Sequence, residues 1–180
     1  MPFDFSGKNV LVTGATRGMG RLLTKCLSSA GAEVYGLGSN RQLLDTLKVE
    51  CENVHTVHVD LADWKATRKT LEQLPAMNGL VNNAGVSLHW VPSLEAGKDV
   101  IDKTFAVNVM AAVNVTQVVG KKMVAAGKGG SIVNVSSVNG LNPNVWRTIC
   151  QRPHDDKTIR SGAWTSQDKG ELSQSDSRTY

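Results

Sequence analysis

A short apolar run leads into a glycine-rich turn near the start of the chain, and this junction limits the possible folds more than any other segment. Residues 8–20 read K-N-V-L-V-T-G-A-T-R-G-M-G. The apolar run predicts a β-strand over residues 9–13, and the residues from Arg21 onward are typical of a helix. Glycines let a backbone turn tightly around an anion, and the N-terminus of the following helix attracts it. The junction therefore predicts a phosphate-binding loop, although three glycines could also simply end a strand.

Strands and helices alternate along the chain after this junction. We expect strands at 33–38, 54–59, 79–82 and 130–136, and helices at about 18–30, 41–50, 63–74 and 98–126. Strands separated by long helices form βαβ units around a parallel sheet, and such sheets bind ligands beyond the carboxyl ends of their strands. The sequence therefore predicts an α/β fold with a doubly wound parallel sheet, Rossmann-like and incomplete at its C-terminal side.

The glycine spacing, T-G-x-x-x-G-x-G, resembles the cofactor loop of the short-chain dehydrogenase/reductase family. Four further segments carry the resemblance: Asp60-Leu61, N-N-A-G at 82–85, F-A-V-N at 105–108, and V-N-V-S-S at 133–137. The N-N-A-G and V-N-V-S-S segments disfavour the alternative of a methyltransferase with a similar glycine loop. The cofactor contacts that the family pattern and the strand ends imply are Gly14, Thr16, Arg17, Gly18, Met19, Gly20, Ser39, Asn40, Arg41, Asp60, Leu61, Asn83, Ala84 and Gly85.

The end of the second expected strand indicates which nicotinamide cofactor fits. NAD-preferring folds of this kind carry an acid there, which binds the ribose 2′-hydroxyl and repels a 2′-phosphate. This chain has Ser39-Asn40-Arg41 instead, and Arg17 lies inside the glycine loop. The planar guanidinium of arginine suits a phosphate monoester. We therefore expect NADP(H), the alternative being that both arginines are ordinary surface residues.

Two residues are expected in a catalytic site because of the resemblance. Ser137, the second of a serine pair, matches the serine that hydrogen-bonds the substrate carbonyl oxygen, and strand alternation would point Ser136 to the other face. Asn108 matches an asparagine that organises a helix carbonyl and a water in the proton relay. The family's proton donor is the tyrosine of a Tyr-x-x-x-Lys motif after the serine. That motif is absent, since the tyrosines of this chain are Tyr35 and Tyr180.

The composition changes near residue 144. From there the chain loses its apolar periodicity and becomes rich in polar and charged residues, which bury too little surface to offset their ordering entropy. We predict a partial dinucleotide-binding domain over 1–143 and a non-homologous, disordered tail over 144–180. Back-translation of Gly162 to Arg178 with chosen codons, read from the second base, gives E-L-G-P-H-K-I-R-V-N-S-V-N-P-T-R, which resembles the family. We infer that the tail is the gene read out of frame, through mis-splicing, an alternative transcript or a gene-prediction error.

The part before the tail resembles one branch of the family. Its members reduce L-xylulose to xylitol, and α-dicarbonyls such as diacetyl, with NADPH, usually as homotetramers. The resemblance lies in F-S-G-K-N-V-L-V-T-G at 5–14 and V-D-L-A-D-W-K-A-T at 59–67. It implies carbonyl reduction by hydride transfer. The alternative is a catalytically defective chain that only binds NADP(H) or associates with full-length subunits.

Composition argues against several other classes of protein. The chain is 41% hydrophobic and 20% charged, and its net charge of +4 comes from scattered basic residues, so we expect no nucleic-acid partner. We see no signal peptide and no apolar run long enough for a membrane span. The three cysteines lack metal or redox spacing. We expect a cytoplasmic protein with reduced thiols, no metal, and a small carbonyl or sugar substrate.

Overall fold

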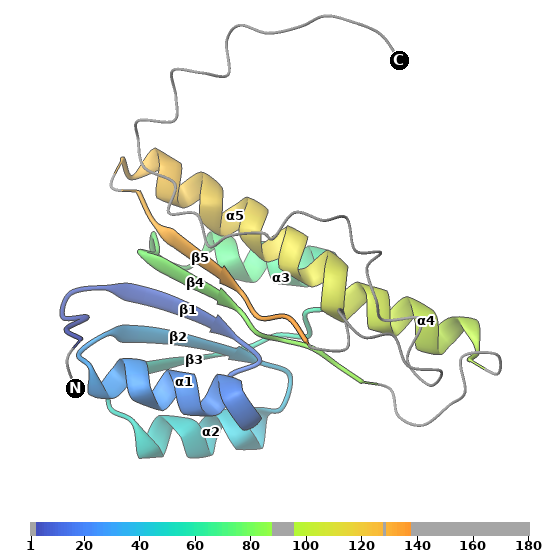
Figure 1. Ribbon diagram of the computed structural model, residues 1–180, viewed down its shortest axis with the longest axis horizontal. Helices are drawn as coiled ribbons and strands as arrows, with labels where there is room; N and C mark the ends of the chain where they lie inside the picture. Colours follow the sequence, from blue (N-terminus) through green and yellow to red (C-terminus); the bar gives the residue numbers. More distant parts are fainter. Residues whose placement is uncertain (1–2, 88–95, 128, 138–180) are drawn as a thin grey trace, which may run out of the picture.

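The computed structural model describes residues 3–87, 96–127 and 129–137, which form one five-stranded parallel sheet flanked by helices (Figure 1). The strands are β1 (Asn9–Thr13), β2 (Glu33–Gly38), β3 (Val54–His58), β4 (Gly79–Asn82) and β5 (Ser131–Asn134). The predicted tail over 144–180 lies outside the described residues. The predicted doubly wound α/β fold is confirmed for the part of the chain that the structure describes.

Helices cover both faces of the sheet. They are α1 (Gly18–Ser29), α2 (Arg41–Glu50), α3 (Trp64–Glu72), α4 (Lys98–Phe105), the π-helical turn η2 (Ala106–Met110) and α5 (Ala111–Ala125). In Figure 1, α1 and α2 lie on one face, and α3 and α5 lie on the other. No helix among the described residues is both long enough and apolar enough to cross a membrane.

The central strand β1 is buried on both faces. Leu11 packs toward α3 and α5, whereas Val10 and Val12 pack toward α1 and α2, because successive side chains of a strand point to opposite faces. Continuous apolar runs of this kind are typical of strands in a parallel sheet that is covered on both sides. The two cores fix β1 firmly, and with it the start of the glycine loop.

The strand order is β3-β2-β1-β4-β5, so the chain crosses from one side of β1 to the other between β3 and β4. Val12 pairs with Val81 of β4 on one side and with Gly36 of β2 on the other. The loops after β1 and β4 therefore leave the sheet side by side. This is the topological switch point at which doubly wound folds bind ligands.

The structure differs from the sequence prediction in two places. The single long helix expected over 98–126 is interrupted by η2, because backbone bonding there shifts to the wider π pattern, which apolar periodicity does not reveal. The last strand ends at Asn134 rather than at Ser136. Ser136 and Ser137 therefore follow the strand, and strand alternation does not fix which way they point.

Candidate cofactor-binding site

The glycine loop adopts a backbone conformation that favours glycine. Gly14 and Gly18 have φ values of +68° and +51°. A Cβ atom on Gly20 would lie 2.2 Å from the carbonyl oxygen of Gly14, and one on Gly14 would lie 2.9 Å from the Cα of Ala84. Side chains at these positions would therefore force apart the glycine loop, α1 and the loop after β4. Of the three predicted glycines, Gly14 lies in the loop, and Gly18 and Gly20 lie in the first turn of α1.

The N-terminus of α1 is open to an anion. Its N-cap is Arg17, in an extended conformation, and no side chain caps the helix by a hydrogen bond. The first turn carries no acidic residue that would compete with a phosphate. Unpaired N–H groups and the helix dipole together attract negative charge. Arg17, Gly18 and Met19 are all exposed at this end.

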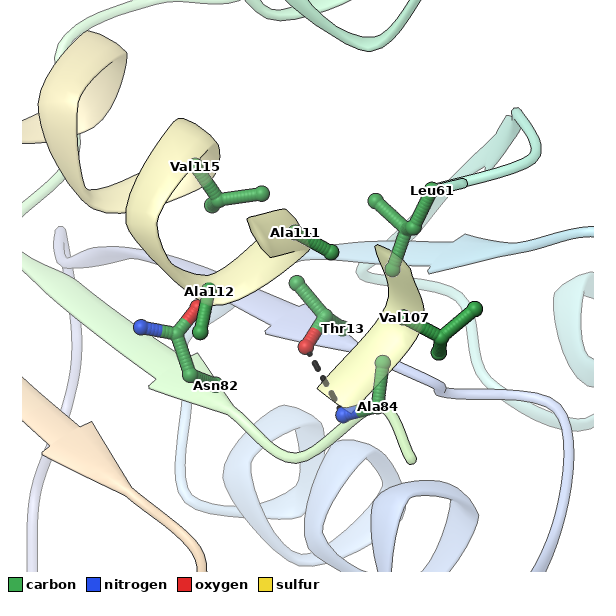
Figure 2. Close-up of a pocket in the computed structure, with 8 residues that line it drawn as sticks. All are labelled: Thr13, Leu61, Asn82, Ala84, Val107, Ala111, Ala112 and Val115. Carbon is green, nitrogen blue, oxygen red and sulfur yellow. Dashed lines mark hydrogen bonds between the residues drawn. The ribbon is translucent and has the colours of Figure 1, made fainter. Parts of the chain in front are cut away.

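Thr13 fastens the glycine loop to the N-N-A-G loop, a role that the sequence analysis missed. Its hydroxyl accepts hydrogen bonds from the backbone N–H groups of Asn83 and Ala84, each at 3.0 Å, and Figure 2 shows the second of these. In return, Nδ2 of Asn83 donates to the carbonyl oxygen of Thr13 at 3.0 Å. The signal that the sequence offered was a threonine at the end of an apolar run, directly before the first glycine.

Asn82 joins β4 to its other neighbours. Its Nδ2 donates to Oδ1 of Asn134 in β5 and to Oγ1 of Thr116 in α5, both at 2.9 Å. Its own Oδ1 is buried with no hydrogen-bond partner among the described residues. Asn82 and Thr13 are the polar side chains of a small, otherwise apolar cavity between the sheet and the helices (Figure 2). Asn82 thus ties β4 to β5 and to α5.

The turn after β2 presents the residues expected to select NADP(H). Ser39 and Arg41 are exposed, and Arg41 is the first residue of α2. Asn40 is the N-cap of α2, since its Oδ1 accepts the N–H of Leu43 at 2.9 Å. His58 at the end of β3 contacts the turn through Nε2, which lies 3.1 Å from the carbonyl oxygen of Ser39. The turn is thus held from two sides while Arg41 stays accessible.

Asp60 and Leu61, after β3, differ in their surroundings. Asp60 is exposed, and its Oδ1 accepts the N–H of Ala62 at 3.0 Å. Leu61 is buried in the core beneath α5. The side chain of Leu61 therefore packs in the core beneath α5. Only its backbone and the exposed Asp60 carboxylate could contact a ligand.

Comparison with known proteins agrees with this geometry. A family model described as short chain dehydrogenase matches residues 8–149. The chain belongs to the short chain dehydrogenase family.

Named relatives of this short chain dehydrogenase are reductases. It is 45% identical to L-xylulose reductase of Mus musculus over 137 residues, and 42% identical to carbonyl reductase [NADPH] 2 of Sus scrofa over 138 residues. These matches cover 76% and 77% of this chain, and 56% of each reductase. The chain thus spans little more than half the length of these relatives.

A solved structure supports the fold of this short chain dehydrogenase. It is a proposed NAD(P)-dependent gluconate 5-dehydrogenase from Beutenbergia cavernae, with NADP bound at low occupancy. The TM-score is 0.75 at 28% sequence identity, and the match covers 83% of this chain and 62% of the other.

Asn108 of this short chain dehydrogenase lies in η2 and binds the loop after β4. Its Oδ1 accepts the N–H of Val86 at 2.7 Å, and its Nδ2 donates to the carbonyl oxygen of Val86 at 2.9 Å. A Cβ on Gly85 would lie 3.6 Å from the same Oδ1, so the loop passes close to this amide. Asn108 therefore holds the N-N-A-G loop against the helix.

Ser137 is exposed, three residues beyond the end of β5. It follows β5, which pairs in parallel with β4, and the N-N-A-G loop begins at the end of β4. The residues that stand where the missing tyrosine motif is expected, near Cys150 and His154, lie outside the described residues. The structure thus brings together the glycine loop, Thr13 and the N-N-A-G loop, and places Asn108 beside them.

Proposed function

We propose that this chain binds NADP(H) across the ends of β1, β2 and β4, and that it serves the NADPH-dependent reduction of a carbonyl compound. The observation that carries the proposal is the packing of Gly14 and Gly20 against Ala84 and its loop, beside the open N-terminus of α1. The names of the relatives point to L-xylulose as the substrate, and family resemblance adds α-dicarbonyls such as diacetyl. Such substrates are small molecules with one reducible carbonyl group or two.

The residues of the site fit a dinucleotide carrying a 2′-phosphate. The backbone between Gly14 and Gly20 would hold the diphosphate, because this segment ends at the uncapped N-terminus of α1. Arg17 and Arg41 would bind the 2′-phosphate, and the turn after β2 presents no acid to repel it. When bound, the cofactor supplies a hydride to the carbonyl carbon.

The remaining chemistry falls to the residues around the substrate. Negative charge develops on the carbonyl oxygen during reduction, and hydrogen-bond donors placed there lower the barrier. We assign this role to the Ser137 hydroxyl. Asn108 acts as a positioning residue, because both ends of its amide hold Val86 and so fix the loop that follows β4.

A second candidate rests on the missing proton donor. Among the described residues Tyr35 is the one tyrosine, and it lies in the middle of β2, stacked on His55 with ring centroids 4.7 Å apart. Burial, together with the nearby Glu33 carboxylate, raises the pKa of Tyr35, which is the opposite of what a proton donor needs. The alternative is a catalytically defective chain that binds NADP(H) or associates with full-length subunits.

Location and assembly follow from the same proposal. We place the protein in the cytoplasm, where Cys26 and Cys51, both outside any disulfide, stay reduced. Full-length relatives of this branch form homotetramers by family resemblance. Association of this chain with such subunits belongs to the second candidate.

An activity assay separates the two candidates. The purified 180-residue chain is mixed with NADPH and with diacetyl or L-xylulose, and NADPH oxidation is followed by absorbance. Turnover that falls strongly in Ser137→Ala supports the reductase. NADPH binding without turnover supports the defective chain. Failure to bind NADPH would contradict the reductase and leave, of the second candidate, only association with full-length subunits.

A further inference from the structure

The side chain of Arg21 in α1 contacts two segments of the cofactor-binding site at once. Its Nη1 donates to the carbonyl oxygens of Thr16, at 3.3 Å, and Leu43, at 3.1 Å. Its Nη2 donates to Oγ1 of Thr46 at 3.1 Å and lies 2.8 Å from Oε1 of Glu50. One guanidinium therefore satisfies three partners in α2 and one in the glycine loop.

The two segments that Arg21 joins correspond to two parts of a dinucleotide. Thr16 belongs to the loop that would hold the diphosphate, and Leu43 lies in the first turn of α2. That turn begins at Arg41, the residue assigned to the 2′-phosphate. The distance between the diphosphate and 2′-phosphate positions therefore depends on how α2 sits against the glycine loop.

Thr16 also contacts the end of β2 directly. A Cβ on Gly38 would lie 2.4 Å from Cγ2 of Thr16, so the glycine loop packs against the strand just before the turn. On the other side of this turn, Arg21 donates a hydrogen bond to the carbonyl oxygen of Leu43. The segment from Gly38 to Leu43 is thus bounded by Thr16 at one end and by Arg21 at the other.

Lys25 provides a natural comparison. It lies one helical turn after Arg21, and its Nζ is 2.7 Å from Oε2 of the same Glu50. Its side chain is 43% exposed, against 20% for Arg21. Its ion pair joins α1 to the far end of α2 rather than to the first turn.

We propose that Arg21 is a positioning residue that sets the preference for NADPH over NADH, acting through α2 and Arg41 rather than by touching the cofactor. This inference rests on the proposed function. NADH has no 2′-phosphate, so its binding depends on the glycine loop and much less on the placement of Arg41. Loss of the Arg21 bridge should therefore weaken NADPH binding more than NADH binding.

The test measures the Kd of NADPH and of NADH for the full chain by isothermal titration calorimetry. We expect Arg21→Met to lower the ratio of NADPH to NADH affinity about five- to tenfold, the range for loss of roughly one hydrogen-bonded contact. Lys25→Met removes a charge from the same helix and the same Glu50, and should leave the ratio unchanged. Arg21→Lys keeps the charge but loses the planar fork, whose second nitrogen contacts Thr46 and Glu50, so the ratio should fall here too.

Circular dichroism establishes that each variant is folded, and Arg21→Lys keeps the test decisive if Arg21→Met does not fold. An unchanged ratio in the Arg21 variants, or an equal loss for both dinucleotides, would overturn the inference and leave the proposed function standing. An equal fall of the ratio in Lys25→Met would also overturn it, because charge alone would then be responsible. Failure of the unaltered chain to bind either dinucleotide would overturn the proposed function and this inference with it.

Discussion

The side-chain hydroxyl of Thr13 accepts a hydrogen bond from the backbone N–H of Ala84 at 3.0 Å (Figure 2). Thr13 ends β1, and Ala84 lies in the loop after β4, so these two residues join the two loops that flank the switch point of the sheet. Thr13 is 2% exposed, and water therefore cannot easily replace its hydroxyl. This contact therefore helps to fix the geometry of the candidate cofactor site.

Thr13→Val should destabilise the protein and loosen the N-N-A-G loop. The substitution keeps the shape of the side chain but leaves the N–H groups of Asn83 and Ala84 without an acceptor, at a cost of about 1–3 kcal/mol for each unsatisfied group. Urea denaturation measures the change in the free energy of unfolding. Thr13→Ser keeps the hydroxyl and should cost clearly less. Equal losses in the two variants would contradict this assignment, because the hydroxyl would then contribute no more than the methyl group.

Gly20→Ala should weaken dinucleotide binding by about tenfold or more, the loss expected when one hydrogen bond to a charged phosphate is broken. The new Cβ would lie 2.2 Å from the carbonyl oxygen of Gly14, so the glycine loop must move. Gly120→Ala, in the interior of α5, is the matched control, because its Cβ would meet nothing within 4 Å. That variant should gain roughly 0.5–1 kcal/mol of stability and keep its affinity. Calorimetric titration with NADPH checks both, and unaltered binding by Gly20→Ala would contradict the assigned loop.

The sequence predicted the strands and the glycine-rich turn well because their signals are local. Residues 9–20 contain an apolar run, a turn and a helix start in direct succession, and each has a short-range cause. The π turn around Asn108 and the hydroxyl contacts of Thr13 were not predictable, since they depend on partners such as Val86 and Ala84 that are distant in sequence. Arg21 was missed for the same reason, because three of its partners lie in α2.

Asn108→Asp should disturb the loop after β4 more than its small change in size suggests. The carboxylate can still accept the N–H of Val86, but its second oxygen would face the carbonyl oxygen of Val86 where an N–H donor stood. We expect a loss of about 1–3 kcal/mol in the free energy of unfolding and faster amide exchange at Val86. Hydrogen exchange measured by NMR tests this, with Asn108→Ala as the variant that removes both bonds without adding charge. Protection of Val86 equal to that of the unaltered chain would contradict the assigned contacts.

Glu50→Gln should make stability less dependent on pH in acid. The Lys25 ammonium and the Arg21 guanidinium both hold the pKa of the Glu50 carboxyl below its usual range. A carboxyl whose pKa is lowered on folding contributes stability above the pKa of the unfolded chain, about 4.3 for glutamate, and this stability is lost as the pH falls further. The free energy of unfolding below that pH should therefore fall less steeply in Glu50→Gln, as measured by urea denaturation at a series of pH values. Identical slopes in the two proteins would refute this role of Glu50.

The most direct test of the central claim is the affinity of the unaltered chain for NADPH and NADH, measured by calorimetric titration under the same conditions. The open N-terminus of α1, with Arg17 and Arg41 exposed beside it, predicts that NADPH binds at least about tenfold more tightly than NADH, the factor given by one charge-assisted contact to the 2′-phosphate. In Arg41→Ala this difference should shrink while NADH affinity stays the same. Equal affinities for the two dinucleotides, or no binding of either, would contradict the account.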